Sequence, residues 1–419
     1  MEEWKTYKLR DVIKLSSGGT PSKSVKSYWN GTIPWISARQ MYCDFINASD
    51  TNISIEGLAN GSKLAPTGST LLLTRGSGLF NHIPVCLVLS PVAYNQDVKC
   101  ILPKDETLLS KEYLFYCLYG KKKEISEILE TTGIGAGKID TDRFLDLTIQ
   151  IPNLRQQELV LIFVSSIFDK IELNNRINHN LEEQAQALYK SWFVDFEPFK
   201  DGKFVESELG MIPEGWRYDY IGKLPIYISD YVSNGSFASL KANVKLHNVK
   251  EYAHFIRNTD LKSETFPIYV DRHSYEFLSK SQLSGGEIII SNVGDVGSVY
   301  ICPTLDGPMT LGNNVIMIKP DNELLQYYLY ILFKWFEGKQ LLKGITGGSA
   351  MPKFNKTDFK SLQILIPSTD VLMAFNAAVK PLFNEINTNS STTQKLSKLR
   401  DTILPKLMSG ELEINEIDC

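Results

Sequence analysis

The chain has 419 residues, of which 43% are hydrophobic and 22% charged; these values are close to the globular average and exclude a disordered or low-complexity chain. Its 44 basic and 48 acidic residues give a net charge of -4, which argues against a histone-like, generally basic nucleic-acid binder. No apolar run is long enough to span a bilayer, and the start of the chain lacks a signal-peptide pattern, so we expect a cytoplasmic protein.

The cysteine and histidine patterns argue against a metal site. The six cysteines form no C-x-x-C pair, which favours reduced and mostly buried thiols in a reducing compartment. The five histidines show no metal-ligand spacing with cysteine or with each other. We therefore expect no bound metal in this chain.

The sequence contains an internal duplication. Phe144 in the first half matches Phe359 in the second, inside two segments with the same order of apolar and polar residues. Further upstream the separation between matching positions is only slightly larger, and Asn95-Gln96-Asp97-Val98 faces Gly312-Asn313-Asn314-Val315. The separation between matching residues is nearly constant across strands, a loop and a helix. Its small change indicates loop insertions or deletions within a common scaffold.

Each half is predicted to begin with a lobe of about 150 residues, rich in short β-branched runs and turn residues. A short helix follows, then a final strand that ends at Ile-Pro, and then a long helix. The predicted strands include Ser69–Thr74, Val85–Leu89, Val98–Leu102, Glu287–Ser291 and Val315–Ile318, and the short helices are Lys111–Tyr119 and Gln326–Phe336.

The two long helices carry a heptad seam. The first spans about Leu154–Val194 without proline or glycine, a length typical of a coiled coil. The second spans about Val371–Met408, and Pro381 should kink it or split off a short first segment. Asn174 and Asn389 occupy equivalent seam positions, where a buried polar residue usually fixes the helix register. The alternative is a solvated polar turn in a poorly packed stretch.

The predicted fold class is α+β: two similar mixed α/β lobes joined by two long antiparallel helices in a coiled coil, with a pseudo-two-fold internal repeat and the lobes at opposite ends. Each lobe carries one more basic than acidic side chain, whereas the helical segments are acidic and should not lie along phosphates. The expected domains are a first lobe at 1–152, a central spacer helix and linker at 153–210, a second lobe at 211–368, and a C-terminal spacer helix with an acidic tail at 369–419.

The sequence gives no support for intrinsic catalysis. The Gly-rich segment 132–139 fails the phosphate-loop pattern, because Thr132 stands at the first glycine position and Ile139 replaces the magnesium-binding Ser or Thr. We interpret it as a flexible loop; the alternative is a loop that places Lys138 and its repeat partner Lys353 near phosphates. Asp97-Val98-Lys99 matches half of a metal-nuclease signature, but no aspartate between residues 51 and 96 supplies the other ligand.

Two similar lobes held apart by helices suit the recognition of a two-part linear target. DNA is the natural one, because two half-sites about one helical turn apart can be met on one face of the duplex. Divergent loops on a shared scaffold would let each half-site have its own sequence. Arg75 stands out, because it lies beside Gly76 and Gly78 in a segment with few charges.

The candidate DNA-binding residues are polar side chains in turn-rich loops, as direct readout of base edges requires. For any one of them an ordinary solvated turn is the alternative. Lys121-Lys122-Lys123 is instead interpreted as a solvated helix end or a phosphate contact. The candidates are Thr20, Ser22, Lys23, Ser37, Arg39, Gln40, Arg75, Ser77, Asn81, His82, Asn95, Gln96 and Lys138 in the first lobe, and Arg257, Asn258, Asn292, Asp295, Asn313, Asn314 and Lys353 in the second.

Four segments make the chain similar to the specificity (S) subunit of type I restriction–modification systems, and the similarity covers essentially its full length. The helix ends Leu181–Phe196 and Leu399–Leu412 and the segment Gly210–Trp216 are the specific ones; the loop motif Tyr28–Ile36 is less so. The second lobe departs from the pattern at Tyr252–Arg257, which replaces a clear copy of residues 31–36 and leaves readout by that loop in question.

The resemblance implies that each lobe is a target recognition domain for one half of a bipartite, asymmetric DNA site. It implies that the helices set the gap between the half-sites and bind two methyltransferase (modification) subunits, which restriction subunits with translocase and nuclease activity then join. S-adenosylmethionine, ATP and Mg²⁺ would belong to those partners. The chain itself would be a non-catalytic subunit with no cofactor of its own.

Aromatic residues crowd the end of the first long helix, and aromatic residues at such density often anchor an interface. We predict partner contacts for Tyr189, Trp192, Phe193 and Phe196. The alternative, which can hold at the same time, is that they dock the helix onto the lobes. Two rival functions stay open at this point: an enzyme that modifies or cuts DNA by itself, and a coiled-coil adaptor or scaffold whose lobes bind protein.

Overall fold

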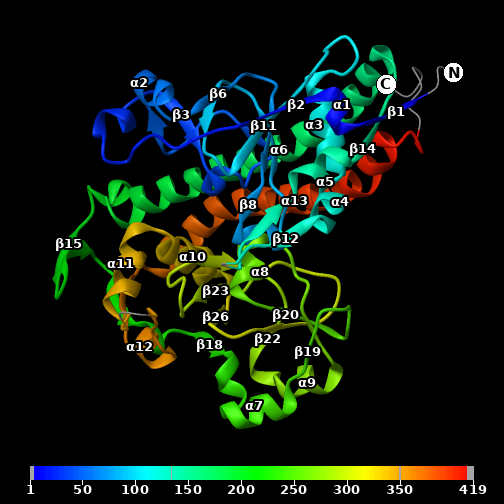
Figure 1. Cartoon of the computed structure of the whole chain (residues 1–419). Coiled ribbons are helices and arrows are strands. Elements are labelled where there is room, and N and C mark those ends of the chain that lie inside the picture. Colours follow the sequence, from blue (N-terminus) through cyan, green and yellow to red (C-terminus); the bar gives the residue numbers. More distant parts are fainter. Residues whose placement is uncertain (1–3, 134, 349–350, 413–419) are drawn as a thin grey trace. The chain divides into compact units, whose positions relative to one another are not determined.

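A computed structural model describes residues 4–133, 135–348 and 351–412. The chain packs into two compact units, the first formed by residues 1–175 with 390–419 and the second by residues 176–389. The long helices α6 (Leu154–Phe193) and α13 (Thr369–Met408) each contribute one stretch to each unit (Figure 1). Each unit thus joins one lobe to parts of both helices. The domain boundaries predicted above follow the repeat and remain a prediction about the sequence.

The first lobe is built mainly of short strands. They are β1 (Lys5–Lys8), β2 (Ile13–Ser17), β3 (Ile33–Ile36), β4 (Phe45–Ile46), β5 (Asn52–Ile53), β6 (Lys63–Ala65), β7 (Thr70–Leu73), β8 (Arg75–Gly76), β9 (Val85–Val88), β10 (Val92–Tyr94), β11 (Val98–Pro103), β12 (Leu129–Thr131), β13 (Gly137–Ile139) and β14 (Thr148–Ile151). They form a five-stranded sheet β2-β11-β7-β9-β4, a four-stranded sheet β5-β3-β10-β6, a three-stranded sheet β12-β13-β8 and the pair β1-β14.

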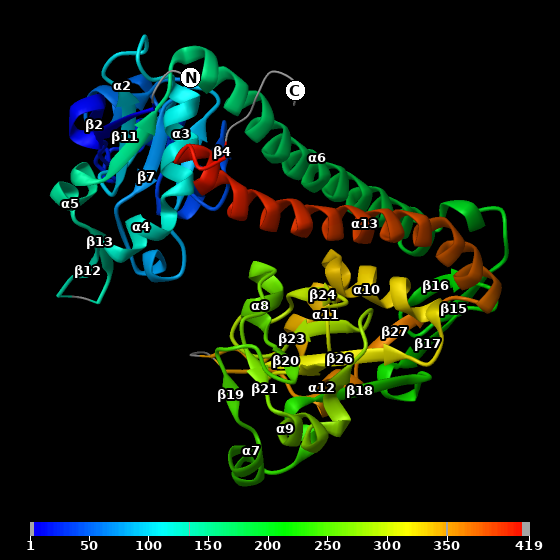
Figure 2. The same ribbon diagram turned by 90° about the vertical axis from the view of Figure 1, so that its right-hand side faces the viewer.

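A buried helix forms the centre of the first unit. The helices of this lobe are α1 (Leu9–Val12), α2 (Ile55–Ala59), α3 (Lys111–Gly120), α4 (Lys122–Glu127) and α5 (Thr141–Asp146). All residues from Tyr113 to Tyr119 of α3 are buried, as expected for a helix that is apolar on all sides. α3 packs against β7, β9 and β11 (Figure 2), and its other side contacts Phe168 of α6. Ser110 caps the helix by accepting a hydrogen bond from the Tyr113 N–H at 3.2 Å.

The second lobe has the same architecture. Its strands are β15 (Phe204–Ser207), β16 (Gly210–Pro213), β17 (Arg217–Tyr220), β18 (Ile226–Asp230), β19 (Leu246–His247), β20 (Ala253–Ile256), β21 (Tyr269–Val270), β22 (Gln282–Leu283), β23 (Ile288–Ser291), β24 (Val299–Ile301), β25 (Met309–Leu311), β26 (Val315–Pro320) and β27 (Gln363–Ile366). Its helices are α7 (Phe237–Asn243), α8 (Asn258–Ser263), α9 (Arg272–Phe277), α10 (Gln326–Lys334), α11 (Phe336–Gly344) and α12 (Lys356–Lys360). The sheets are β18-β26-β23-β24, β19-β21-β20-β25-β22 and the pairs β15-β16 and β17-β27.

Strand pairing confirms the duplication. The order β2-β11-β7-β9 of the first lobe recurs as β18-β26-β23-β24 in the second. The parallel pair β3-β10 recurs as the parallel pair β20-β25. β20 of the second lobe therefore corresponds to β3 of the first. The sequence of residues 252–257 differs from that of residues 31–36, but the strand is present in both lobes.

The predicted elements agree with the structure except at one point. The strands, both short helices and both long helices are confirmed, with small differences at their ends. Pro381 lies inside the continuous helix α13, so of the two expected outcomes the split into two segments is wrong, and the kink stays a prediction. Of the described cysteines, Cys86, Cys100, Cys117 and Cys302 are buried and Cys43 is exposed, which confirms mostly buried thiols.

Within each unit, the stretches of α6 and α13 pair antiparallel. In the first unit the Asn174 Nδ2 donates to Thr393 Oγ1 at 3.2 Å, and Phe168 meets Arg400 further along. In the second unit the Asn178 Nδ2 donates to the Ile386 carbonyl at 3.4 Å. Asn174 is fully buried and Asn389 is 8% exposed, so the solvated alternative for these two residues is wrong.

The start of α6 is fixed to the first lobe by a buried amide. The Gln157 side chain donates to the carbonyls of Leu108 at 2.8 Å and Pro152 at 2.9 Å, and it accepts from the Ser110 N–H at 3.0 Å. Because the Gln157 side chain is only 1% exposed, these bonds avoid the cost of leaving its buried polar atoms unsatisfied. The long helix thus leaves its lobe in a defined direction.

Candidate nucleic-acid interface

Backbone hydrogen bonds join the loops that carry the first lobe's candidates. The Asn95 N–H donates to the Ile36 carbonyl at 2.9 Å, and the Thr74 N–H donates to the Asp97 carbonyl at 2.8 Å. The Ile139 N–H donates to the Thr74 carbonyl at 2.9 Å. These bonds place loop 37–40, turn 95–97, β8 and β13 side by side. The Thr20 hydroxyl joins the same cluster by donating to Gln96 Oε1 at 2.6 Å.

Two candidate cations, Arg75 and Lys138, are direct neighbours at the centre of this cluster. They are opposite one another in the antiparallel pair β8-β13, so their side chains emerge on the same face. On the other side of Lys138, the pair β12-β13 sets Glu130 opposite it, so the three side chains form a row of two cations and one carboxylate on one face of the sheet.

Lys99 is a further member of the basic cluster and is absent from the candidates chosen from the sequence. Burial lowers the pKa of Lys99, the charge of Asp97 opposes this shift, and the charges of Arg75 and Lys63 add to it. The Lys99 ammonium donates to the hydroxyl of Ser17, the last residue of β2, which is opposite Lys99 in the pair β2-β11. Sequence reasoning missed Lys99 because the segment Asp97-Val98-Lys99 resembles only half of a nuclease signature. The alternation of side chains along a strand does not by itself show that Lys99 lies near Arg75.

Some of the side chains predicted to contact DNA bases form hydrogen bonds within the protein instead. Asn95 is 6% exposed, and its Oδ1 accepts from the N–H groups of Asp97 and Val98, both at 3.1 Å. The Gln40 Nε2 donates to Asp50 Oδ1 at 2.6 Å, and the Ser37 hydroxyl donates to Gln40 Oε1 at 2.8 Å. These bonds shape the loops, and a base contact by Asn95 would require its bonds to break. Arg39, beside Ser37, is exposed.

The remaining candidates of the first lobe lie on exposed loops. The Ser22 hydroxyl is 2.8 Å from that of Ser24 in the loop that also carries Lys23. Ser77 begins the 3-10 helix Ser77–Phe80, and Asn81 and His82 follow its end. Burial lowers the pKa of His82, and the charge of Lys122, which belongs to the contacts between lobe and helices, adds to this shift.

The interpretation of Lys121–Lys123 as a solvated helix end is wrong for Lys122. Its side chain is only 19% exposed. The Nζ atom lies 3.2 Å from the centre of the Tyr119 ring and 3.9 Å from Asp44 Oδ1. The aromatic face and the carboxylate offset part of the cost of burying the ammonium group.

The second lobe repeats the loop cluster. The Gly312 N–H donates to the Ile256 carbonyl at 2.7 Å, as Asn95 does to Ile36 in the first lobe. The Asn292 N–H donates to the Asn314 carbonyl at 3.1 Å, which joins the loop after β23 to turn 312–314. The backbone of Lys353 forms isolated antiparallel β-bridges with Val293 and Gly347. Lys353 thus pairs with the loop after β23, as Lys138 pairs with β8 in the first lobe.

The chemistry of this second cluster differs. Asn292 stands at the repeat position of Arg75, and its Nδ2 donates to the Phe354 carbonyl at 3.1 Å. The Arg257 guanidinium makes two bonds to the buried Asp260, Nε to Oδ2 at 2.9 Å and Nη2 to Oδ1 at 2.6 Å. Base contacts by these two side chains would have to compete with these bonds.

A loop carboxylate and two amides complete the second cluster. Asp295 Oδ2 accepts from Ser298 at 3.1 Å and from the Asn258 Nδ2 at 3.5 Å, and it pairs with Lys262 at 3.4 Å. Asn313 and Asn314 are exposed, and Asn314 has a left-handed backbone (φ 67°). The second lobe therefore keeps a lysine at the place of Lys138, but it presents amides and a carboxylate where the first lobe has Arg75.

Two of the four aromatic partner candidates are in the core of the second unit. Tyr189 is 3% exposed and Phe193 is 5% exposed. The ring of Phe193 lies 4.7 Å from that of Phe375 and 4.9 Å from that of Tyr328. This packing supports the reading that they dock the helix onto the lobe. Trp192 and Phe196 are half-buried, and partner contact for any of the four remains a prediction.

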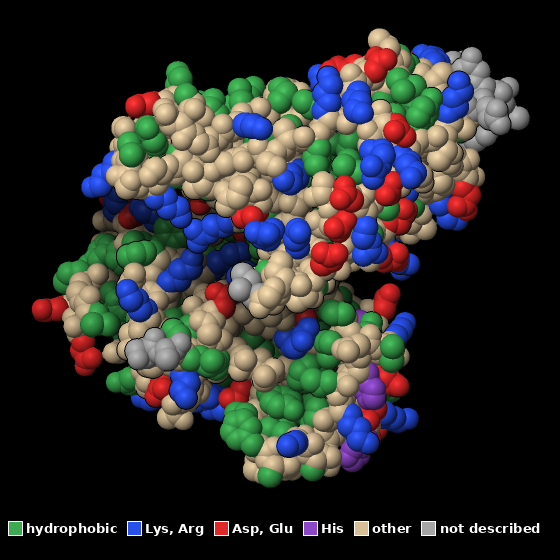
Figure 3. Space-filling model, viewed as in Figure 1, with side chains coloured by type: hydrophobic (Ala, Val, Ile, Leu, Met, Phe, Trp, Pro, Cys, Tyr) green, Lys and Arg blue, Asp and Glu red, His purple; other side chains and the backbone are tan. Residues whose placement is uncertain are grey.

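The charged surface is mixed rather than uniformly basic. Figure 3 shows Lys and Arg side chains among Asp and Glu side chains over the end of the first unit that carries β1 and α5. There Asp146 pairs with Lys8 at 2.9 Å and with Arg10 at 3.1 Å. Within the described residues, no group of three or more His, Cys, Asp or Glu side chains is arranged to hold a metal ion. No described helix has the length and apolar content needed to cross a bilayer.

Comparisons with known proteins agree on one family. A family model described as the type I restriction modification DNA specificity domain matches residues 1–183 and 230–399. The specificity subunit of the type I restriction enzyme MjaIX from Methanocaldococcus jannaschii is 29% identical, over 99% of this chain and 95% of the relative. The HindI specificity subunit from Haemophilus influenzae is 23% identical, over 98% of this chain and 100% of the relative.

A solved structure shows the same fold. The crystal structure of a type I restriction–modification S subunit from M. genitalium aligns with a TM-score of 0.52 and 14% identity. The alignment covers 99% of this chain and 97% of that chain.

Proposed function

The chain belongs to the type I restriction–modification DNA specificity family, whose members are non-catalytic recognition subunits, and on this basis we propose that each lobe reads one half of a bipartite, asymmetric DNA site. The observation that carries the proposal is the duplicated loop cluster with divergent side chains. Arg75 in the first lobe corresponds to Asn292 in the second, on equivalent backbones. Two lobes that share a backbone fold but carry different polar side chains in their loops are suited to bind two half-sites of different sequence.

In the first lobe, we assign base readout to Arg75 and phosphate contact to Lys138. A guanidinium can donate two hydrogen bonds to guanine O6 and N7, whereas a lysine is a point charge suited to phosphate. The position of Arg75 opposite Lys138 would put one group on a base edge and the other on the adjacent backbone. Gln96 and Thr20, which are hydrogen-bonded to each other in the same loop cluster, would supply further donors and acceptors.

In the second lobe, Lys353 takes the role of Lys138, and the exposed amides Asn313 and Asn314 are the favoured base readers. An amide side chain is complementary to the N6 and N7 edge of adenine. Asp295 can accept a hydrogen bond from cytosine N4 if the bonds that it accepts from side chains such as Ser298 are broken. The two lobes would thus differ in the bases that they prefer.

We assign the spacing of the half-sites, and the binding of two methyltransferase subunits, to the long helices. α6 exposes apolar side chains in the first unit: Ile162 is 58% exposed and Leu173 is 47% exposed. Their separation along the helix is close to three full turns, so both lie on one helix face. Exposed apolar residues aligned in this way are typical of a protein contact.

The complete complex would include restriction subunits in addition to the methyltransferase subunits. We assign S-adenosylmethionine, ATP and Mg²⁺ to those partners. This function needs access to cellular DNA, so the cytoplasmic location expected from the sequence remains part of the proposal. The alternative function, a scaffold whose lobes bind protein, predicts no selection of DNA sequence.

The proposal is tested by DNA binding of the chain assembled with a cognate methyltransferase. Arg75→Ala should weaken binding to the selected site by about 1–3 kcal/mol and relax the preference at one base pair. Lys138→Ala should weaken binding to all sequences alike and lower the salt slope by about one. Lys8→Ala, in the β1 ion pair, is the matched control and should change neither. Failure to select any two-part sequence from random DNA would favour the scaffold.

A further inference from the structure

The loop of residues 18–24 follows β2 and carries three of the candidate DNA contacts of the first lobe. Ser22 and Lys23, at its tip, are exposed. The Thr20 hydroxyl donates to Gln96 Oε1 at 2.6 Å, which joins the loop to the rest of the candidate cluster. An exposed tip that presents its side chains at a fixed place needs support from within the lobe, because a mobile loop has to be ordered when it binds.

Two tryptophans supply this support through their indole N–H groups. The Trp35 Nε1 donates to the Gly19 carbonyl at 3.1 Å, and the Trp29 Nε1 donates to the Ser22 carbonyl at 3.1 Å. The Gly19 N–H donates in turn to the Tyr94 carbonyl at 2.9 Å. These bonds therefore hold the loop both at its base and at its tip.

The base of the loop lies too close to its neighbours to carry side chains. A Cβ atom at Gly18 would be 2.1 Å from the Tyr94 carbonyl oxygen, and one at Gly19 would be 2.2 Å from the Gly61 carbonyl oxygen. Real side chains do not approach so closely, so both positions require glycine. The base of the loop is thus fixed by packing as well, and the Trp29 bond matters most at the exposed tip.

Both indoles belong to a small hydrophobic cluster of their own. The rings of Trp29 and Trp35 meet edge to face, with their centroids 5.2 Å apart and their planes at 84°. Trp35 is buried with Ile53 and Ala93, and this group is separate from the main core of the first lobe. A change in the cluster should therefore affect the loop more than the fold of the lobe.

The second lobe does not repeat this arrangement. Phe255 lies opposite Thr310 in the pair β20-β25, as Trp35 lies opposite Ala93 in the pair β3-β10, so the two aromatic residues correspond. A phenylalanine has no ring N–H to donate. Its ring instead meets that of Tyr231, the residue directly after β18, at 5.7 Å. An indole hydrogen bond to the loop after the first strand of the main sheet is thus a feature of the first lobe.

We propose that Trp29 and Trp35 are positioning residues, whose indole N–H groups fix the loop that contacts DNA in the first lobe. This inference rests on the proposed function and adds to it how one of the contacting loops is held. In this role the two tryptophans act through the loop and need no contact with DNA of their own. Loss of an indole N–H would leave the polar side chains of the loop in place but make their positions less defined.

Trp29→Phe tests the proposal in the full-length chain assembled with a cognate methyltransferase. The phenyl ring keeps an aromatic side chain in the cluster and removes the N–H. The affinity for the selected DNA site should fall at least about threefold, and the base preference should relax in one half-site only. The Tm should fall by no more than about 3 °C. Trp35→Phe should relax the preference in the same half-site.

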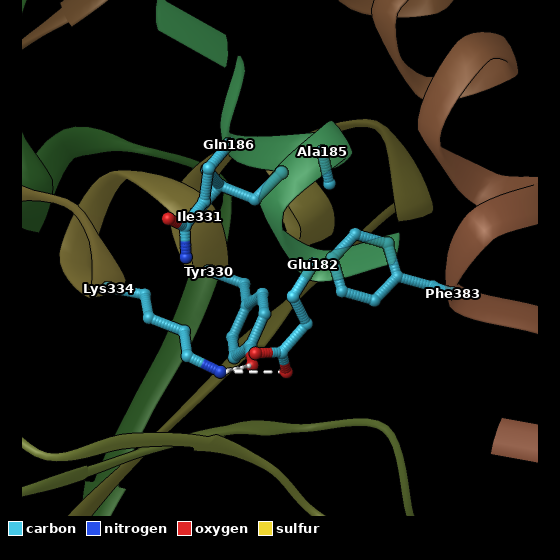
Figure 4. Close-up of a pocket in the computed structure, with 7 residues that line it drawn as sticks. All are labelled: Glu182, Ala185, Gln186, Tyr330, Ile331, Lys334 and Phe383. Carbon is cyan, nitrogen blue, oxygen red and sulfur yellow. Dashed lines mark hydrogen bonds and ion pairs between the residues drawn. The ribbon is translucent and has the colours of Figure 1, made fainter. Parts of the chain in front are cut away.

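A control variant in the second unit separates positioning from a general loss of stability. The Lys334 ammonium lies 2.8 Å from Glu182 Oε1 and donates to the Tyr330 hydroxyl at 2.7 Å, as Figure 4 shows. Lys334→Ala removes this partner from both groups and should lower the Tm. It should leave the half-site that is relaxed by Trp29→Phe unchanged.

A second comparison shows whether Trp29 acts through the loop. In a chain that already carries Thr20→Val, Ser22→Ala and Lys23→Ala, the loop has lost its polar side chains. Trp29→Phe should then have no further effect on DNA binding, because there is nothing left for it to position. An undiminished effect of Trp29→Phe in this chain would overturn the proposal.

The failure of this inference can be told apart from the failure of the proposed function. If the wild type selects a two-part sequence and Trp29→Phe keeps both its affinity and its base preference, the positioning role alone is refuted. Equal relaxation of both half-sites, or the same relaxation by Lys334→Ala, would also refute it. A wild type that selects no two-part sequence would refute the proposed function and this inference together.

Discussion

At the scale of single residues, Lys122 gives the clearest pH-dependent prediction. Burial lowers the pKa of Lys122 to about 8, while its charge is partly offset by Asp44. In the unfolded chain a lysine keeps its proton up to about pH 10.4. The folded state therefore carries the full cost of a buried ammonium below pH 8, and this cost falls as the pH rises from 8 towards 10.

Urea unfolding of the wild-type chain and of Lys122→Met at pH 7 and pH 9.5 measures this effect. The free energy of unfolding of the wild type, relative to the variant, should increase by about 2 kcal/mol between the two pH values. Subtracting the variant removes the titration of all other groups that it shares with the wild type. A difference between the two proteins that stays the same at both pH values would show that Lys122 titrates normally.

Residue types in loops can be predicted from the sequence, but their bonds cannot. Arg75 is identified by its glycine neighbours, and the structure places it in the basic cluster beside Lys138. Asn95 and Arg257 carry equally suitable side chains, yet both are bonded within the protein, to turn 95–98 and to Asp260. Such bonds depend on which loops meet in space, and a single sequence without its fold does not contain that information.

At the scale of elements, the end of α6 has two faces with different expected roles. Phe193 packs against Phe375, Tyr328 and Trp216, so Phe193→Ala should lower the free energy of unfolding by about 3–5 kcal/mol. Trp192 is half-buried, and Trp192→Ala should cost less stability and, if it contacts a partner, should weaken binding to the methyltransferase. Chemical unfolding and co-purification of both variants separate the two roles. Equal losses of stability would remove the distinction between the faces.

Elements with strong periodicity or clear punctuation are predictable. The Ile-Pro boundary closely sets the start of both long helices, because proline cannot continue the strand and the seam begins soon after it. Pro381 does not divide the helix, since α13 continues through it, and only the expected kink stays open as a prediction. The very short strands β8 and β12, which build the basic cluster, carry too few residues for a pattern and become visible only through their pairing with β13.

At the scale of the whole molecule, the proposal that the exposed face of α6 binds the methyltransferase can be tested by removing its apolar side chains. The double variant Ile162→Ser, Leu173→Ser should reduce co-purification with the methyltransferase at least about tenfold, because it removes apolar contact area. The Tm should stay within about 2 °C of the wild type, since both side chains are exposed. Ser165→Ala, on the same helix, is the control. Undiminished co-purification would place the partner on another surface.

The central claim is that the two lobes read the two halves of the target independently. The most direct measurement is to replace residues 1–152 with the corresponding lobe of another specificity subunit and to map the methylated adenines made by the assembled methyltransferase. The account predicts that one half of the recognised sequence changes while the other half and its methylated adenine persist. A target that changes in both halves, or in neither, would contradict it.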